Sequence, residues 1–177
     1  MTEYEERLTL TKMTTKRRFI LATFMAWLLF LMLDFLAHAS LLNSFWAKEY
    51  AALKSKEELF RLIPFGYVSF FLLVFLVGWL YTRLFKSSES IKTGLCFGAV
   101  FGGLFSLSIF LGWYSFLNLP ALFLFLASFV YFLEILGVGF AYGYLLPPVS
   151  IKKRVWGLAV VILFGFILGI ALQNILP

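Results

Sequence analysis

Five long apolar runs constrain this chain more than any other feature of its sequence. A bilayer core about 30 Å thick requires about 20 apolar residues in a helix, and every run is long enough. In lipid each backbone polar group must be satisfied within its own segment, so each run predicts a transmembrane α-helix. The composition is 62% hydrophobic and 14% charged, whereas a soluble domain is about half apolar and a quarter charged. The runs span residues 19–42, 63–84, 94–116, 121–146 and 155–176.

The predicted fold is therefore all-α: a polytopic membrane bundle of five transmembrane helices in a single transmembrane domain, residues 19–177. Residues 1–18 are polar and mixed in charge, and we expect them to form a short cytoplasmic tail, partly helical at most. The connector 43–62 mixes aromatic with charged residues, which predicts a short segment lying in the membrane interface. Ser55 and Glu58 make a capping-box pattern, and Ser90 is a candidate N-cap of the third helix.

Lysine and arginine predict the orientation of the bundle. Of the 15 basic residues, 11 lie in the tail, in the connector after the second helix and before the fifth helix. The positive-inside rule then places the N-terminus inside and the C-terminus outside, so we expect a multi-pass protein of the cell (inner) membrane. The net charge of +6 lies beside apolar runs, where it attracts anionic lipid headgroups at the cytoplasmic side. We expect no nucleic-acid partner.

Small residues recur at every fourth position in three of the predicted helices. Such stripes let two helix backbones approach closely in lipid, so they predict a compact bundle. A stripe can equally face a second copy of the chain or a partner membrane subunit, and the sequence leaves these alternatives open. The helix-packing glycines are Gly94, Gly98 and Gly102 in the third helix, Gly139 and Gly143 in the fourth, and Gly165 and Gly169 in the fifth.

Three ionisable side chains, Asp34, His38 and Glu134, lie well inside the apolar runs. A charge at the bilayer centre costs at least about 2.5 kcal/mol on insertion scales, so such residues should face the bundle interior and indicate function. At about 1.5 Å of rise per residue, Asp34 and Glu134 both lie near mid-depth, whereas His38 lies one turn nearer the outer surface. Tyr131 shares the helix face of Glu134. These four residues are the candidate intramembrane polar pocket.

Two interpretations of these side chains remain open. In the functional one, Asp34, His38 and Glu134 line a pocket that exchanges protons or binds a cation. In the structural one, Asp34 bonds His38 or a neighbouring hydroxyl, and a protonated Glu134 bonds Tyr131 or a backbone carbonyl, so that both only fix the packing. One His and two carboxylates complete three metal ligands only if their helices are adjacent. We therefore assign no metal site and no cofactor from the sequence.

Sequence motifs give little support to an enzyme. Glu57 and Glu58 lie outside the apolar runs, where they do not fit the paired-Glu motif of intramembrane proteases. The sequence contains no His-Glu-x-x-His, Cys-x-x-Cys, Gly-x-Ser-Gly or Walker A motif. We lean towards a protein without catalytic residues.

The chain resembles small uncharacterised bacterial inner-membrane proteins of the four-helix domain-of-unknown-function type. The resemblance rests on an acidic residue late in the first helix, the connector residues Phe45 to Lys48, the glycine-rich segment 94–102 and the Gly137-Val138-Gly139 sequence. It covers roughly residues 19–146, and the fifth helix lies outside it. It implies a bacterial inner-membrane protein and no particular activity.

Two functions follow as hypotheses. The first is a small integral membrane protein that binds or transports a proton-linked or lipophilic small solute through the polar pocket. The second is an accessory subunit that scaffolds a larger membrane complex through its glycine faces and has no chemistry of its own.

Overall fold

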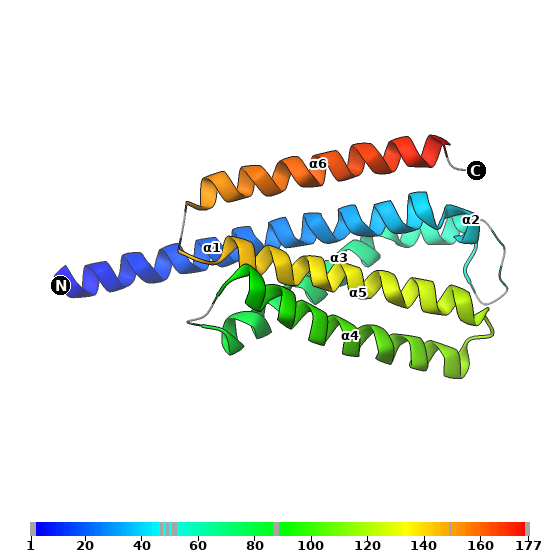
Figure 1. The fold of residues 1–177 in the computed structure, drawn as a ribbon, viewed down its shortest axis with the longest axis horizontal. Coiled ribbons are helices and arrows are strands. Elements are labelled where there is room, and N and C mark those ends of the chain that lie inside the picture. Colours follow the sequence, from blue (N-terminus) through cyan, green and yellow to red (C-terminus); the bar gives the residue numbers. More distant parts are fainter. Residues whose placement is uncertain are drawn as a thin grey trace.

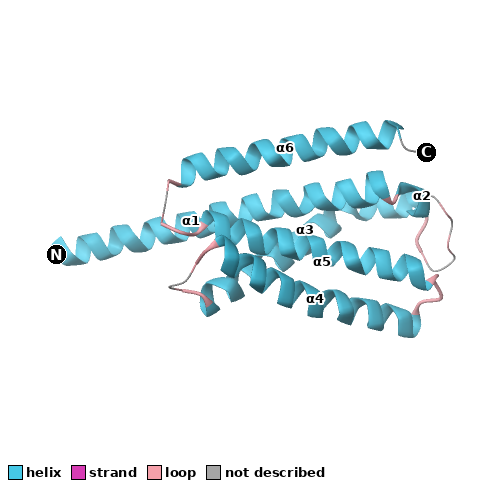
Figure 2. Cartoon of the chain, in the orientation of Figure 1, coloured by secondary structure: helices cyan, strands magenta, loops and turns pink. Residues whose placement is uncertain are grey.

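The computed structural model describes residues 3–46, 48, 50, 53–86, 89–148 and 150–175. Three sequence predictions fall partly outside these ranges: the first two residues of the tail, residues 47, 49, 51 and 52 of the connector, and residue 176 of the fifth apolar run. Within the described residues the chain forms helices and connections and contains no strand (Figure 2).

Five helices are long and apolar enough to cross a bilayer. They are α1 (Glu3–Asp34) with its continuation η1 (Phe35–Leu41), α3 (Lys56–Leu84), α4 (Ile91–Phe116), α5 (Ala121–Leu145) and α6 (Ile151–Ile175). A short helix, α2 (Asn43–Trp46), lies in the first connector. The helices run side by side, and the N-terminus lies at the opposite end of the bundle from the C-terminus (Figure 1). The chain is a multi-pass helical membrane bundle.

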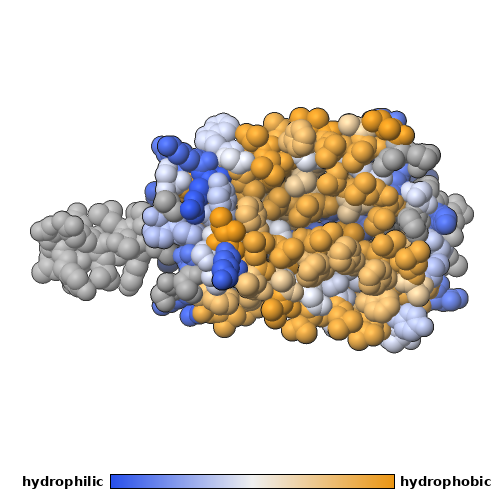
Figure 3. Space-filling view, in the orientation of Figure 1, coloured by the Kyte–Doolittle hydropathy of each residue, from blue (hydrophilic) through white to orange (hydrophobic). Residues whose placement is uncertain are grey.

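Apolar side chains cover the middle of the molecule on the face seen in Figure 3, and hydrophilic residues gather towards both ends. Large apolar residues on the surface include Phe65, Val100 and Phe164, each at least 65% exposed. Water would make such a surface unfavourable, whereas lipid tails solvate it. The apolar belt is therefore the surface that meets the bilayer.

Helix caps explain why two helices begin before their apolar runs. The backbone N–H of Glu58 donates to Ser55 Oγ at 3.3 Å, and the Glu58 carboxylate accepts from the Ser55 N–H, so α3 begins at Lys56. The backbone N–H of Thr93 donates to Ser90 Oγ at 3.1 Å, so α4 begins at Ile91. Both predicted caps are confirmed. The connector 43–62 consequently contains the first turns of α3, while its placement in the membrane interface stays a prediction.

The first helix differs most from its prediction. It begins at Glu3, so the backbone of the predicted tail continues the first span as a helix. At Phe35 its winding changes to a π-helix that runs to Leu41, and the N–H of Leu42 donates to the carbonyl of Ala37 at 2.8 Å. The π-helix is rare in proteins, and π segments are often found at functional sites.

The glycine stripes lie between helices of the same chain. A methyl group on Gly94 would overlap the Gly139 carbonyl, and one on Gly98 would lie 3.0 Å from the Ile135 carbonyl. These contacts make α4 and α5 the most extensive helix pair among the described residues. Gly165 and Gly169 face Met32 and Phe35, which brings α6 against the first helix. Gly102 and Gly143 also lie in the α4–α5 contact.

Two arginines hold the C-terminal end of α5. Arg18 donates to the carbonyls of Leu146 and Pro147, at 3.2 and 2.7 Å, and Arg154 donates to the carbonyl of Tyr144. The last carbonyls of a helix lack hydrogen-bond partners within the helix, and a cation at this end interacts favourably with the helix dipole. This end of α5 is thereby tied to both α1 and α6.

Candidate functional site

The structure brings Asp34, His38 and Glu134 together inside the bundle. Their ligating atoms, one from each side chain, all lie within 4.8 Å of one another. His38 Nε2 is 3.8 Å from Asp34 Oδ1, one turn away on the same helix, and Glu134 faces them from α5. His38 therefore joins the two carboxylates, although its depth in the sequence placed it nearer the surface.

Small residues on α5 allow α1 to approach the site closely. A methyl group on Gly137 would lie 2.7 Å from Leu33 Cδ1, too close for two carbons. Gly137 is one turn from Glu134, and Leu33 precedes Asp34. The glycine thus sets the distance between the two helices where the two carboxylates meet.

The π segment is fixed on its other side by α6. Ser40 Oγ donates to the Gly169 carbonyl at 2.8 Å, in a buried position, and the Phe35 and Phe166 rings have centroids 5.8 Å apart. A methyl group on Gly169 would lie 2.7 Å from the Phe35 ring. The close approach of α6 holds η1, and with it His38, against the rest of the bundle.

Glu134 is the most unusual residue of the site. Its side chain is 1% exposed, and neither carboxylate oxygen accepts a hydrogen bond from a described donor, so a proton held between Glu134 and Asp34 is the hydrogen bond open to it. An orphaned buried polar group costs about 1–3 kcal/mol. The bonded Glu134 of the structural interpretation, with Tyr131 or a carbonyl as its partner, is not found among these residues.

A second buried polar contact in the same bundle shows the usual arrangement. The Tyr142 hydroxyl lies 2.9 Å from the Thr23 hydroxyl oxygen and donates to the Val74 carbonyl at 3.1 Å. It thereby joins α5 to α1 and α3 with its hydrogen-bonding capacity used. Buried polar groups in folded proteins are normally satisfied in this way, whereas in α5 Ser128 Oγ and the two carboxylate oxygens of Glu134 lack such partners among the described residues.

Tyr131 lies beside the cluster without bonding to Glu134. Its ring packs edge-on against Phe105 and Trp113 of α4, with centroids 6.0 and 6.2 Å away. Its hydroxyl lies within the electrostatic reach of both carboxylates. Tyr131 thus borders the site from the α4 side.

A cavity of about 400 Å³ opens next to Asp34 and His38. Its walls come from α1, η1, α3 and α6, and they include Gly66, Tyr67 and Phe166. Two wall residues, Ile63 and Tyr67, are 40% and 46% exposed on the surface of the bundle. The site therefore has two layers: Asp34 and His38 line the cavity, and Glu134 lies behind them.

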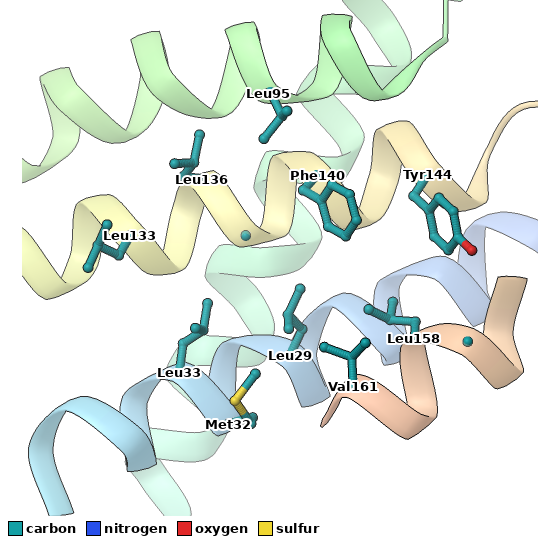
Figure 4. A pocket seen from close by; sticks show the side chains of 12 residues that line it. Leu29, Met32, Leu33, Leu95, Leu133, Leu136, Phe140, Tyr144, Leu158 and Val161 are labelled. Atoms are coloured by element: carbon teal, nitrogen blue, oxygen red, sulfur yellow. The ribbon is translucent and has the colours of Figure 1, made fainter. Parts of the chain in front are cut away.

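A larger groove of about 680 Å³ lies between α5, α6 and α1 (Figure 4). Leu33 lines this groove, whereas its neighbour Asp34 lines the cavity. Tyr144 contributes the only polar side-chain group among the groove's described lining residues. The groove is suited to apolar chains, and the charged groups of the polar site lie outside it.

The structure brings three of the four candidate residues together, Asp34, His38 and Glu134, and sequence reasoning missed the wall contributed by α3. Gly66 and Tyr67 lie in a continuous apolar run in which nothing distinguishes a residue facing a cavity from one facing lipid. The π segment was also missed, since residues 35–41 carry no proline or glycine that would announce a change in winding.

Comparisons of the chain with family models, with curated proteins and with solved structures found no match. The resemblance to small four-helix inner-membrane proteins therefore stays a prediction.

Proposed function

We propose that this protein binds a small proton-linked solute in the cavity beside Asp34 and His38 and moves it across the membrane. One observation carries the proposal: Glu134, 1% exposed and without a hydrogen-bond partner among the described residues, faces both of these side chains. A carboxylate kept in this state reduces stability. Residues of this kind inside membrane spans indicate ion or solute pathways.

The charge arrangement supplies a physical reason for proton linkage. Two carboxylates this close in a medium of low dielectric repel each other when both are ionised. Loading the pair with a proton or a cation relieves that repulsion. A solute that enters the cavity can therefore exchange with bound protons at Asp34, His38 and Glu134.

The scaffolding alternative receives less support from the packing. All seven glycines of the predicted stripes face other helices of the same chain, so these stripes are already used within the bundle. A scaffold would have to bind its partner through other surfaces, and it would give no reason for the buried Glu134.

The proposal includes an orientation and a location. The N-terminus lies in the cytoplasm and the C-terminus outside, in the inner membrane of a cell, because of the positive charge near the N-terminal end. Asp34, His38 and the cavity then lie in the outer half of the bundle, towards the end that carries α2.

Proton movement into liposomes tests the transport function. Purified protein is reconstituted with a pH-sensitive dye inside, and a membrane potential is imposed. We expect proton uptake above that of empty liposomes, lowered about tenfold or more by Asp34→Asn and by Glu134→Gln. Glu57→Gln, an exposed residue in the first turn of α3, is the matched control and should leave the uptake unchanged.

Two results would overturn the proposal. One is wild-type protein that moves no more protons than empty liposomes. The other is unchanged uptake in Asp34→Asn and Glu134→Gln together with a loss of stability, since that combination identifies the carboxylates as packing residues.

A further inference from the structure

We propose that Asp34, His38 and Glu134 bind a divalent transition-metal ion, of the kind represented by Mn²⁺, Fe²⁺, Co²⁺ and Zn²⁺. The inference rests on the proposed function, because it names the class of solute that the polar site takes. It concerns binding at these three side chains and is tested separately from transport.

The geometry provides three donor atoms around one point. Two carboxylate oxygens and one imidazole nitrogen lie within 4.8 Å of one another. An ion held at about 2.0–2.2 Å from each donor keeps them at most about 4.4 Å apart. A bound ion would thus require the most distant donors to approach each other by about 0.4 Å. The adjacency of α1 and α5, on which the three-ligand arrangement depends, is present in the structure.

The buried Glu134 provides an independent reason for a ligand at this point. Both of its oxygens are shielded from solvent and lack hydrogen-bond partners among the described residues, yet the side chain is aimed at Asp34 and His38. A divalent cation would neutralise the two carboxylates and supply the missing partner. Breaking such a site by removing one partner leaves an uncompensated buried charge.

The donor types favour a transition metal over Mg²⁺ or Ca²⁺. Those two ions prefer sites made entirely of oxygen atoms, whereas imidazole suits Zn²⁺, Fe²⁺ and other transition metals. A thiolate is the donor that selects Cu⁺, and Cys96 is exposed on α4. A donor set of two carboxylates and one imidazole therefore points to ions of intermediate softness.

The cavity gives the ion a route and leaves part of its coordination open. Asp34 and His38 line the 400 Å³ space, so an ion can reach them before it meets Glu134. Three protein ligands leave at least one position for water. An ion held in this way can leave again, as a transported solute must.

Metal binding to the full-length protein in detergent tests the inference. The protein is freed of metal with EDTA, the chelator is removed, and Co²⁺ is titrated while visible absorption and calorimetric heat are recorded. We expect saturable binding of one Co²⁺ per chain, with displacement by Zn²⁺ and none by Mg²⁺. Glu134→Gln, Asp34→Asn and His38→Gln should each weaken the binding by about 100-fold or more, while Glu57→Gln leaves it unchanged.

The spectrum keeps the inference falsifiable where a variant folds poorly. Wild-type protein must show ligand-field bands of Co²⁺ bound to nitrogen and oxygen donors, and Glu134→Asp, which keeps the carboxylate, should retain binding with an altered spectrum. No saturable Co²⁺ binding by wild-type protein, or equal binding by folded Glu134→Gln, would overturn the inference.

The two proposals fail in different ways. Proton uptake that depends on Asp34 and Glu134 without any metal binding rejects the metal and leaves the transport function standing. If the protein binds the metal but takes up neither protons nor metal into liposomes, the metal site is retained and the transport function is rejected. If neither metal binding nor uptake into liposomes is found, the metal site and the transport function are both rejected.

Discussion

Replacing Glu134 with methionine should stabilise the protein while abolishing its transport. The side chain is buried and its two oxygens have no partners among the described residues. Methionine is unbranched and of similar length, so it occupies the same space without a polar group. If Glu134 served packing alone, its removal would instead destabilise the bundle.

The magnitude follows from two opposing terms. Removing an orphaned buried polar group relieves about 1–3 kcal/mol. An imperfect fit of the new side chain costs up to about 1.5 kcal/mol. We therefore expect a net stabilisation of about 1 kcal/mol, measured in metal-free protein so that no bound cation satisfies the carboxylate.

Unfolding by SDS in mixed micelles, followed by far-UV circular dichroism in the presence of EDTA, measures the difference. Ile135→Met is the matched control, because Ile135 is the next residue of α5, is 0% exposed and carries no polar group. It should destabilise by less than about 1.5 kcal/mol. If Glu134→Met lowers stability as much as Ile135→Met does, the carboxyl group makes stabilising contacts and the reasoning is refuted.

Three further outcomes are expected. Gly139→Ala should destabilise the protein by about 1–3 kcal/mol in the same SDS assay, because the new methyl group would overlap the Gly94 carbonyl. Gly103→Ala is the control and should be neutral or slightly stabilising, because its methyl group would meet no described atom within 4 Å. Equal destabilisation by the two substitutions would contradict the packing of α4 on α5. Ser40→Ala should lower the stability by about 0.6 kcal/mol, because it removes the 2.8 Å hydrogen bond to the Gly169 carbonyl. Amide hydrogen exchange checks this: relative to wild type, the substitution should speed exchange more in residues 35–41 than in α4. Burial raises the pKa of Glu89 above its ordinary 4.5, with the nearby Arg18 charge opposing the shift. A raised folded-state pKa contributes stability that is present below the ordinary pKa and lost as the pH rises through the folded value. As the pH rises above 4.5 the wild type should therefore lose more stability than Glu89→Gln, and parallel curves of stability against pH would reject the assignment.

The sequence predicts the membrane spans well because lipid imposes them. Length, hydropathy and caps such as Ser55 and Ser90 act within a single segment, so they can be read locally. The depths of Asp34 and Glu134 also follow from local counting, and the structure places the two side chains opposite each other.

The remaining features depend on contacts between segments far apart in the chain. Lipid tails are as apolar as leucine, so hydropathy does not distinguish the face of α3 that lines the cavity, with Gly66 and Tyr67, from the face in lipid. The π winding at residues 35–41 coincides with the packing of Phe35 and Ser40 on α6, and no residue within that segment signals it. A depth count treats each helix as regular and isolated, so it could not show that His38 lies within reach of Glu134.

The seam between α4 and α5 has a consequence for how this chain can diverge over generations. At Gly94 and Gly139 each glycine lies against the carbonyl oxygen of the other, so the obstacle to a larger side chain is main chain, which no substitution elsewhere can shrink. A loss at either position therefore has no compensating second mutation, in contrast to a side-chain contact such as Gly165 with Met32. Descendant chains should keep this glycine pair fixed while the lipid-facing residues around it drift, which makes the pair, together with acids at 34 and 134, the pattern by which distant relatives can be found.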